Sequence, residues 1–322
     1  MEERTEMFVK EPDILKDVQR SRIRALVKLF YDLQKERIAI GNRIVSYFRL
    51  AAGLSPQEPD KPDLDPEEDA LLHKVLLEYY AILDSYTALS ETNKTTPRIS
   101  TVIKNFTNKS YILSETEYVL CQLYADLVNS EERLRSRVEK EVQLHPMWDA
   151  FFSQVKGCGP LMSAVCLAYF DPYTARHCSS FWKYAGLDTV VSKDKDGKDV
   201  RQGRRAWHTE KRTYIDKDGN KGEKVSLTYN PFVKTKLVGV LGSCFVKSGG
   251  KYRQIYDDYK FRLQQRGDES LTPGHIHAMA NRYAVKMFLR DMWVAWRTLE
   301  GLPVSDPYEV AYLGHKPHGY NY

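Results

Sequence analysis

The chain has 322 residues, of which 42% are hydrophobic and 28% charged, and its formal net charge is +5 at neutral pH. This composition excludes a disordered chain and a membrane protein, and the charged start Met-Glu-Glu-Arg-Thr-Glu is unlike a secretory signal. The mildly positive balance is compatible with an anionic partner. Five scattered cysteines predict reduced thiols, so we expect a cytoplasmic protein with no membrane contact.

The N-terminal part of the chain predicts long helices. Residues 1–18 form an acidic arm, and residues 19–146 a helical coiled-coil region. Between Gln19 and Leu50, apolar residues recur at steps of three and four, which requires a partner helix, and Arg37 alone breaks the seam. The predicted seam is Ile23, Leu26, Phe30, Leu33, Ile40, Ile44 and Tyr47. The basic residues outside the seam have two interpretations, a solvated face or a strip that contacts nucleic acid.

Two further helices follow in the same region. A Pro- and Asp-rich linker spans 51–66, and Asp65 caps the helix after it. Ser114 and Glu117 predict a capping box for another long helix, which Pro146 ends. Its predicted seam is Leu113, Leu120, Leu123, Leu127, Leu134 and Val138. The first and last long helices pair with each other or with a second copy, so we expect a homo-oligomer formed through the coiled coil.

A glycine-rich turn begins the C-terminal region. Gly157 and Gly159 allow a tight turn, and Pro160 suits the first position of a helix. Bare backbone N–H groups at a helix N-terminus attract phosphate. The stretch therefore predicts a helix-hairpin-helix motif that binds the nucleic-acid backbone and does not contact bases. Lys156 lies next to the turn of this motif. The alternative is an ordinary glycine turn between packed helices.

The C-terminal domain, residues 147–300, also predicts a small β insertion. Two Asp-Gly turns favour a pair of hairpins over 192–225, with an arginine cluster and a tryptophan between them. Arginines beside an aromatic ring suit phosphate pairing and base stacking; the alternative is a mobile, solvated ribbon. Asn230 and Pro231 then predict a helix start, and residues 301–322 form a tail. The predicted nucleic-acid contacts are Lys156, Gly157, Gly159, Arg201, Arg204, Arg205, Trp207, Asn230, Lys234 and Lys236.

Several stretches match one family in order. The first is Val155–Ala164, against Ile-x-Gly-Ile-Gly-Pro-x-x-Ala, and the second Phe181–Leu187, against Phe-x-x-Tyr-Ala-Gly-Leu. The third is Ser226 with Asn230 and a basic helix after it, and the closing helices lie at Tyr256–Arg266 and Ile276–Trp296. In this order the chain resembles the bridge-RNA-guided insertion-sequence transposases, the DEDD or Piv/MooV recombinase family. The helix at Arg22–Phe48 is similar to the start of that family's coiled coil.

The resemblance implies a composite mechanism. In the family an N-terminal domain holds four acidic residues that bind Mg²⁺, and a serine of the C-terminal domain attacks the phosphodiester and forms a phosphoserine. Ser226 matches that serine. The acidic domain precedes the coiled coil in the family, where this sequence has residues 1–18, so we expect no cofactor or metal site in this chain and Mg²⁺ only where a partner supplies the acidic site. Tyr229 and Cys158 also depart from the family pattern, which has Gly and an aliphatic residue there.

Three functions stay open at this point. The first is a transposase-related protein that binds DNA, with structured RNA as a second partner, in recombination or transposition. The second is an active serine recombinase that uses Ser226 with metal ligands from another chain. The third is a non-enzymatic helical assembly protein. The fold class is mainly α, a coiled-coil stalk with a helix-hairpin-helix domain and a β-hairpin insertion.

Overall fold

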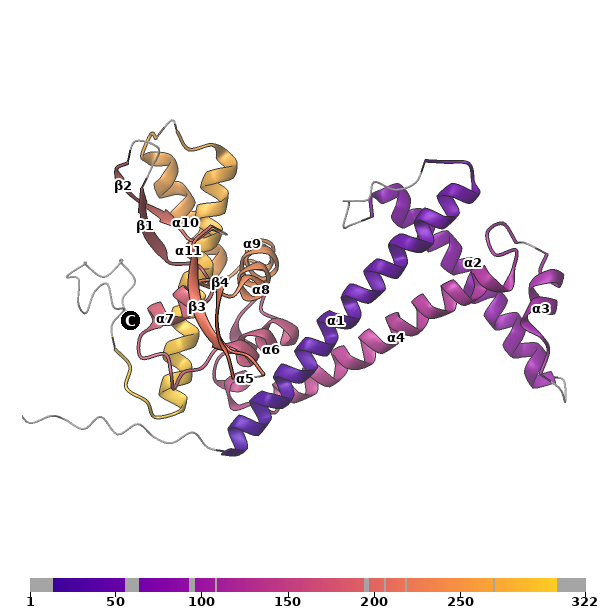
Figure 1. The fold of residues 1–322 in the computed structure, drawn as a ribbon, viewed down its shortest axis with the longest axis horizontal. Helices are drawn as coiled ribbons and strands as arrows, with labels where there is room; N and C mark the ends of the chain where they lie inside the picture. Colours follow the sequence, from indigo (N-terminus) through magenta and orange to yellow (C-terminus); the bar gives the residue numbers. More distant parts are fainter. Residues whose placement is uncertain are drawn as a thin grey trace, which may run out of the picture. The chain divides into compact units, whose positions relative to one another are not determined.

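A computed structural model describes residues 14–55, 64–92, 96–107, 109–193, 197–205, 207–217, 219–268 and 270–305. The fold is mainly helical with small antiparallel hairpins, as the sequence predicted (Figure 1). The chain divides into two compact units, Lys28–Arg137 and the remainder, here called the helical unit and the C-terminal unit. Most of the predicted arm and tail lies outside the described residues. No described helix combines the length and apolarity that crossing a bilayer requires.

The helical unit is built from four helices. They are α1 (Ile14–Ala51), α2 (Pro66–Thr92), α3 (Ile99–Asn105) and α4 (Glu115–Gln143), and α1 and α4 continue into the C-terminal unit. The predicted Asp65 cap is confirmed, and the predicted capping box is half formed, because the Ser114 hydroxyl donates to the Glu117 carboxylate and accepts no backbone N–H of the described residues. Asp65 Oδ1 accepts from the backbone N–H groups of Glu67 and Glu68, at 3.0 and 2.9 Å, and Glu117 accepts from the N–H of Ser114.

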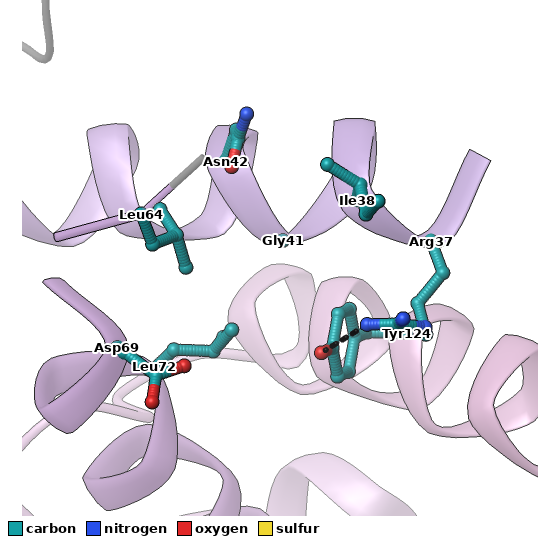
Figure 2. Close-up of a pocket in the computed structure, with 8 residues that line it drawn as sticks. All are labelled: Arg37, Ile38, Gly41, Asn42, Leu64, Asp69, Leu72 and Tyr124. Carbon is teal, nitrogen blue, oxygen red and sulfur yellow. Dashed lines mark hydrogen bonds between the residues drawn. The ribbon is translucent and has the colours of Figure 1, made fainter. Parts of the chain in front are cut away.

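Helices α1 and α4 pair antiparallel within one chain. Arg37 Nε donates to Glu131 Oε2 at 2.6 Å, and Tyr47 Oη donates to Glu117 Oε1 at 2.8 Å. Figure 2 shows Arg37 extending from α1 to the hydroxyl of Tyr124 on α4, beside a pocket of about 230 Å³. Arg37, which breaks the predicted seam, thus forms an ion pair across it with the buried Glu131 carboxylate.

The predicted seams are only partly correct. Leu113 is 62% exposed and Leu123 is also exposed, whereas Tyr118 and Cys121 of α4 are buried. The reason is that α2 and α3 share the core, as the ring contact of Tyr79 with Tyr118 at 5.0 Å shows. A helix that meets several partners buries a wider face than the two-helix seam assumed in the prediction. In α1, Phe48 is buried and Tyr47 is exposed, contrary to the prediction.

Glu78 of α2 ties down the segment that leads into α4. Its carboxylate accepts from the backbone N–H groups of Ser110 at 2.8 Å, Tyr111 at 3.1 Å and Ile112 at 2.8 Å. Since bonds to a charged acceptor are the stronger kind, we expect Glu78→Ala to lower the unfolding free energy by about 2 kcal/mol. Denaturant titration and amide exchange at residues 110–112 measure this. Glu91→Ala, an exposed carboxylate on α2, is the control, and unchanged exchange in Glu78→Ala would contradict the clamp.

The C-terminal unit packs shorter helices around one long one. They are α5 (Pro146–Ala150), the 3₁₀ turn η1 (Phe152–Gln154), α6 (Pro160–Tyr169), α7 (Cys178–Tyr184), α8 (Pro231–Lys234), the π-helix η2 (Thr235–Leu241), α9 (Gly242–Ser248), α10 (Lys251–Gln265) and α11 (Pro273–Leu299). Helix α11 lies beside α10 and is largely buried (Figure 1). Trp182 of α7 donates to Lys286 O at 2.9 Å, and Trp293 of α11 donates to Ala175 O at 2.8 Å.

Two local features of this unit differ from what the sequence pattern alone suggests. Ser179 and Ser180 are of a residue type that often caps a helix, but α7 begins at Cys178 after His177, so neither serine caps it. The helix that starts at Asn230 and Pro231, as predicted, is interrupted by the π-helix η2 between α8 and α9. His275 and His277, at the start of α11, are both exposed, and His277 Nδ1 lies 2.6 Å from the hydroxyl of Tyr256.

Two hairpins form the predicted β insertion. Strands β1 (Thr189–Lys193) and β2 (Asp199–Gly203) pair antiparallel, as do β3 (Thr209–Ile215) and β4 (Lys221–Leu227). Gly197 and Gly219 have φ of +77° and +83°, as such turns require. Their Asp partners, Asp196 and Asp218, lie outside the described residues. Every residue of β3 is exposed, and Ser226 in β4 faces Glu210 across the ladder.

Candidate nucleic-acid interface

The glycine turn has one covered side and one open side. Gly157 has φ +90°, and a Cβ there would lie 2.6 Å from Ser248 Oγ and 3.1 Å from Cys244 O, so it packs closely against α9. Gly159 is exposed, and nothing lies within 4 Å of where its Cβ would be. Lys156 is exposed beside it. Gly157 is therefore required for packing, whereas Gly159 and the start of α6 remain accessible.

The element before the turn is shorter than a helix-hairpin-helix implies. It consists of α5 and the 3₁₀ turn η1, after which Cys158 N–H donates to Val155 O at 3.1 Å. Pro160 opens α6 after Gly159, as predicted. Cys158 is buried, with its Sγ 3.6 Å from Ser163 Oγ, and burial raises the pKa of its thiol to about 12. Cys158 thus occupies a buried position of the kind that an aliphatic residue fills.

Arg204 holds the end of β2 in place. Its Nε lies 2.6 Å from Asp188 Oδ1, and its Nη1 donates to Thr228 Oγ1. Thr228 Oγ1 donates in turn to His208 O at 3.0 Å. Because its guanidinium already binds Asp188 and Thr228, the main role of Arg204 is to fix the segment that joins β2 to β3. Arg201 lies in β2, and its side chain is outside the described part of the chain.

Cationic groups from distant parts of the sequence converge at this segment. The amine of Lys234 donates to Arg204 O at 2.6 Å and lies over the ring of Tyr229 at 4.6 Å. Burial lowers the pKa of Lys234, and the charges of Arg282, Arg205 and Arg204 lower it further, while Asp188 raises it. Burial and the charge of Arg205 likewise lower the pKa of Arg282. We call Arg204, Arg205, Lys234 and Arg282 the cation cluster.

The cation cluster has more positive charges than there are described acidic side chains to pair with them. Among the described acidic residues, Asp188 is the one that raises the pKa of Lys234, and it already pairs with Arg204. Neither Arg205 nor Arg282 forms an ion pair within the part of the chain that the structure describes. Like charges held together in a partly buried place cost free energy that a bound anion would relieve.

Trp207 and Arg205 form the exposed edge of the cluster. The guanidinium of Arg205 lies over the Trp207 ring, 5.1 Å from its centroid, and Trp207 is 61% exposed. Arg205 N–H donates to His208 Nδ1 at 2.8 Å, which leaves the proton of a neutral ring on Nε2. His208 Nε2 is enclosed and has no hydrogen-bond partner. An arginine stacked on an exposed tryptophan suits both phosphate and base contacts.

Two of the predicted nucleic-acid contact residues, Asn230 and Lys236, make contacts within the protein. Asn230 caps α8 by accepting from Val233 N–H at 3.1 Å, and its amide donates to the hydroxyl of Tyr184 at 2.9 Å. Lys236 in η2 lies over the Phe232 ring at 5.7 Å, and burial lowers the pKa of its amine. Asn230 therefore positions the helix that carries Lys234, and its side chain is occupied.

Ser226, the residue matched to a nucleophile, lies in a strand. The predicted hairpins over 192–225 ended just before it, but β4 continues to Leu227. Its Oγ is enclosed and has no hydrogen-bond partner. In this conformation the hydroxyl cannot reach a phosphodiester, so an attack would need the β3–β4 hairpin to move.

Sequence reasoning missed Arg282, His208 and a pocket beside the cluster. The pocket has a volume of about 360 Å³ and is lined by Tyr184, Arg212, Leu227, Thr228, Tyr229, Asn230 and Pro231. Arg282 lies in α11, far along the chain from the predicted motifs, and no local pattern marks it. His208 had a weak signal, since it belongs to the arginine- and tryptophan-containing stretch.

The metal-ligating side chains of the described residues are scattered. No group of three or more His, Cys, Asp or Glu side chains lies close enough together there to bind a metal ion. Neither the protein-family models nor the curated proteins searched include a match to this sequence.

Proposed function

We propose that the chain is a transposase-related DNA-binding protein that holds the phosphate backbone at the cation cluster. The supporting observation is the accumulation of like charge there: Lys234 Nζ donates to Arg204 O at 2.6 Å, and burial first, with neighbouring arginines after it, lowers the pKa of both Lys234 and Arg282. A phosphate placed among these groups would offset their repulsion and satisfy several donors at once. Backbone contacts of this kind position a protein on DNA without selecting a sequence.

The glycine turn supplies a second, weaker point of contact. Gly159 is open to solvent at the start of the ten-residue helix α6, and the exposed Lys156 lies next to it. Together with the order of motifs that resembles the bridge-RNA-guided transposases, this supports a helix-hairpin-helix-like role, in which the short α5 and η1 replace the first helix. Structured RNA is a second partner in this proposal, because it has the same phosphate backbone.

The helical unit would serve assembly. Its α1–α4 pair carries exposed apolar side chains, Leu29, Val119 and Leu123 among them, which a second copy would cover. In this proposal the coiled coil joins copies of the chain, so that two cation clusters act on one DNA molecule. Sedimentation at several protein concentrations tests the oligomer.

A second function, an active serine recombinase, is supported by the orphaned hydroxyl of Ser226. Buried hydroxyls without a partner are uncommon, and they gather at functional sites or at places that rearrange. The metal ligands and the Mg²⁺ would come from another chain. Ser226→Ala distinguishes the two functions, because DNA binding survives in both and strand joining is lost only in the recombinase.

Salt-dependent DNA binding tests the main proposal. Phosphate contacts release counterions, so with about three phosphates neutralised the affinity for duplex DNA falls about 40-fold between about 50 and about 200 mM salt. Fluorescence anisotropy of a labelled duplex of arbitrary sequence measures it, and a second duplex of different sequence should bind about equally well. Absence of binding, or binding insensitive to salt, would instead favour a non-enzymatic helical assembly protein.

A further inference from the structure

Trp207 is the one tryptophan of the described chain that is left largely in water. Trp182, Trp293 and Trp296 are buried, and the first two donate their ring N–H to backbone oxygens. Trp207 is 61% exposed. Burying an aromatic ring of this size would contribute a large favourable free energy, which Trp207 forgoes by staying in water. Its exposure therefore indicates that the ring contacts a binding partner.

The backbone that carries the ring is also held in place. His208 N–H donates to Arg205 O at 3.0 Å, and Thr209 N–H donates to Trp207 O at 3.0 Å. The Arg204 bonds to Asp188 and Thr228 anchor the same connection. The tryptophan therefore projects from a braced turn between two hairpins, which limits the ordering entropy that a ligand must overcome.

The surroundings of the ring indicate which ligand it meets. The Arg205 guanidinium lies over the ring, 5.1 Å from its centroid, and the His208 ring lies alongside at 5.9 Å, tilted by 34°. A further cation lies on the same connection, because Lys234 Nζ donates to Arg204 O at 2.6 Å. A flat aromatic surface bordered by cations is complementary to a flat base bordered by phosphates.

We infer that Trp207 stacks on an unpaired nucleobase, so that the cation cluster takes single-stranded or locally unpaired nucleic acid in preference to a closed duplex. The inference rests on the proposed nucleic-acid binding and specifies its substrate. In a closed duplex both faces of every internal base are covered by its neighbours, and a tryptophan face can reach only a base that has left the stack. DNA and RNA strands offer the same stacking surface.

The test compares three labelled probes: oligothymidine, oligouridine and a closed duplex hairpin of equal charge. We expect Trp207→Ala to weaken binding of the single strands about tenfold, the size of one lost base stack, and to leave the duplex unchanged. Trp207→Phe keeps an aromatic face and should recover most of the affinity. The salt slope should be equal in all variants, because no charge is removed. Since Trp207 is exposed, the variants should melt at the wild-type temperature.

Each outcome decides something. Equal weakening for single strands and duplex, or a Trp207→Phe variant as weak as Trp207→Ala, would overturn the stacking inference while leaving nucleic-acid binding in place. A wild-type chain that binds none of the three probes would remove the proposed function itself. Stronger binding of oligouridine than of oligothymidine would identify RNA as the preferred strand, and the reverse would identify DNA. Quenching of tryptophan fluorescence by oligothymidine should disappear in Trp207→Phe.

Discussion

Replacing Gly242 with alanine should destabilise the C-terminal unit by about 2 kcal/mol. A Cβ at Gly242 would lie 2.0 Å from Asn281 Oδ1 and 2.8 Å from its Cγ, which is far inside contact distance. Asn281 is 7% exposed and donates through Nδ2 to Val238 O at 3.1 Å, so it cannot rotate away freely. The clash costs about 3 kcal/mol, and the better helix propensity of alanine returns about 1 kcal/mol.

Gly239 provides the matched control for this substitution. It belongs to the same helical run, but nothing lies within 4 Å of where its Cβ would be. Gly239→Ala should therefore be neutral or stabilise by up to about 1 kcal/mol. Thermal and denaturant unfolding compare the two variants. In the double variant Gly242→Ala with Asn281→Ala the loss should be smaller than the sum of the single losses, because the clash is gone. Equal stabilisation by both alanines would contradict the close packing of α9 on α11.

The same asparagine accounts for a feature that sequence could not predict. A π-helix leaves the ordinary helical hydrogen-bond pattern, and Val238 O in η2 receives its bond from Asn281 of α11. Asn230 and Pro231 predicted the start of this helix, but the sequence did not indicate a π segment within it, because propensity and periodicity describe only local residues. The partner that stabilises the π segment is supplied by a helix much later in the chain.

Local signals were reliable where the physical cause was local. Asp65, Pro160 and Asn230 start helices as predicted, because a cap bonds to the N–H groups of its own first turn. Gly186 follows the end of α7 with φ +65°, and the N–H groups of Gly186 and Leu187 donate to carbonyls of the preceding turn, which is the usual role of a glycine at a helix end. These elements required no knowledge of the tertiary fold.

Signals that depended on a partner were less reliable. Arg37 broke the predicted seam, and only the facing Glu131 explains its place. Arg204 and Asn230 have the residue types of nucleic-acid contacts, but Asp188 and Tyr184 occupy them. Arg282 joins the cation cluster from α11 without any motif of its own. The candidate site could thus be located from sequence, whereas its composition required the fold.

Arg282→Glu should abolish measurable nucleic-acid binding at moderate salt, with a loss of affinity of about 100-fold. The substitution removes one cation and places a carboxylate beside Lys234 and Arg205, where it would pair with them and repel phosphate. Lys74→Glu, an exposed residue of α2 in the helical unit, gives the same change in net charge and is the control. Anisotropy titrations with single-stranded probes measure both. Equal losses in the two variants would mean that overall charge, and not this cluster, drives binding.

The pH dependence of binding tests whether the phosphate lies beside Lys234 without removing a positive charge from the cluster. Burial and the neighbouring arginines lower the pKa of Lys234, so its amine loses its proton at a lower pH than an ordinary lysine. A phosphate beside it favours the charged form, so binding is linked to proton uptake and weakens as pH rises through the alkaline range. Lys234→Arg keeps its charge throughout that range and should flatten the profile. An unchanged profile in Lys234→Arg would mean that the phosphate lies elsewhere than beside Lys234.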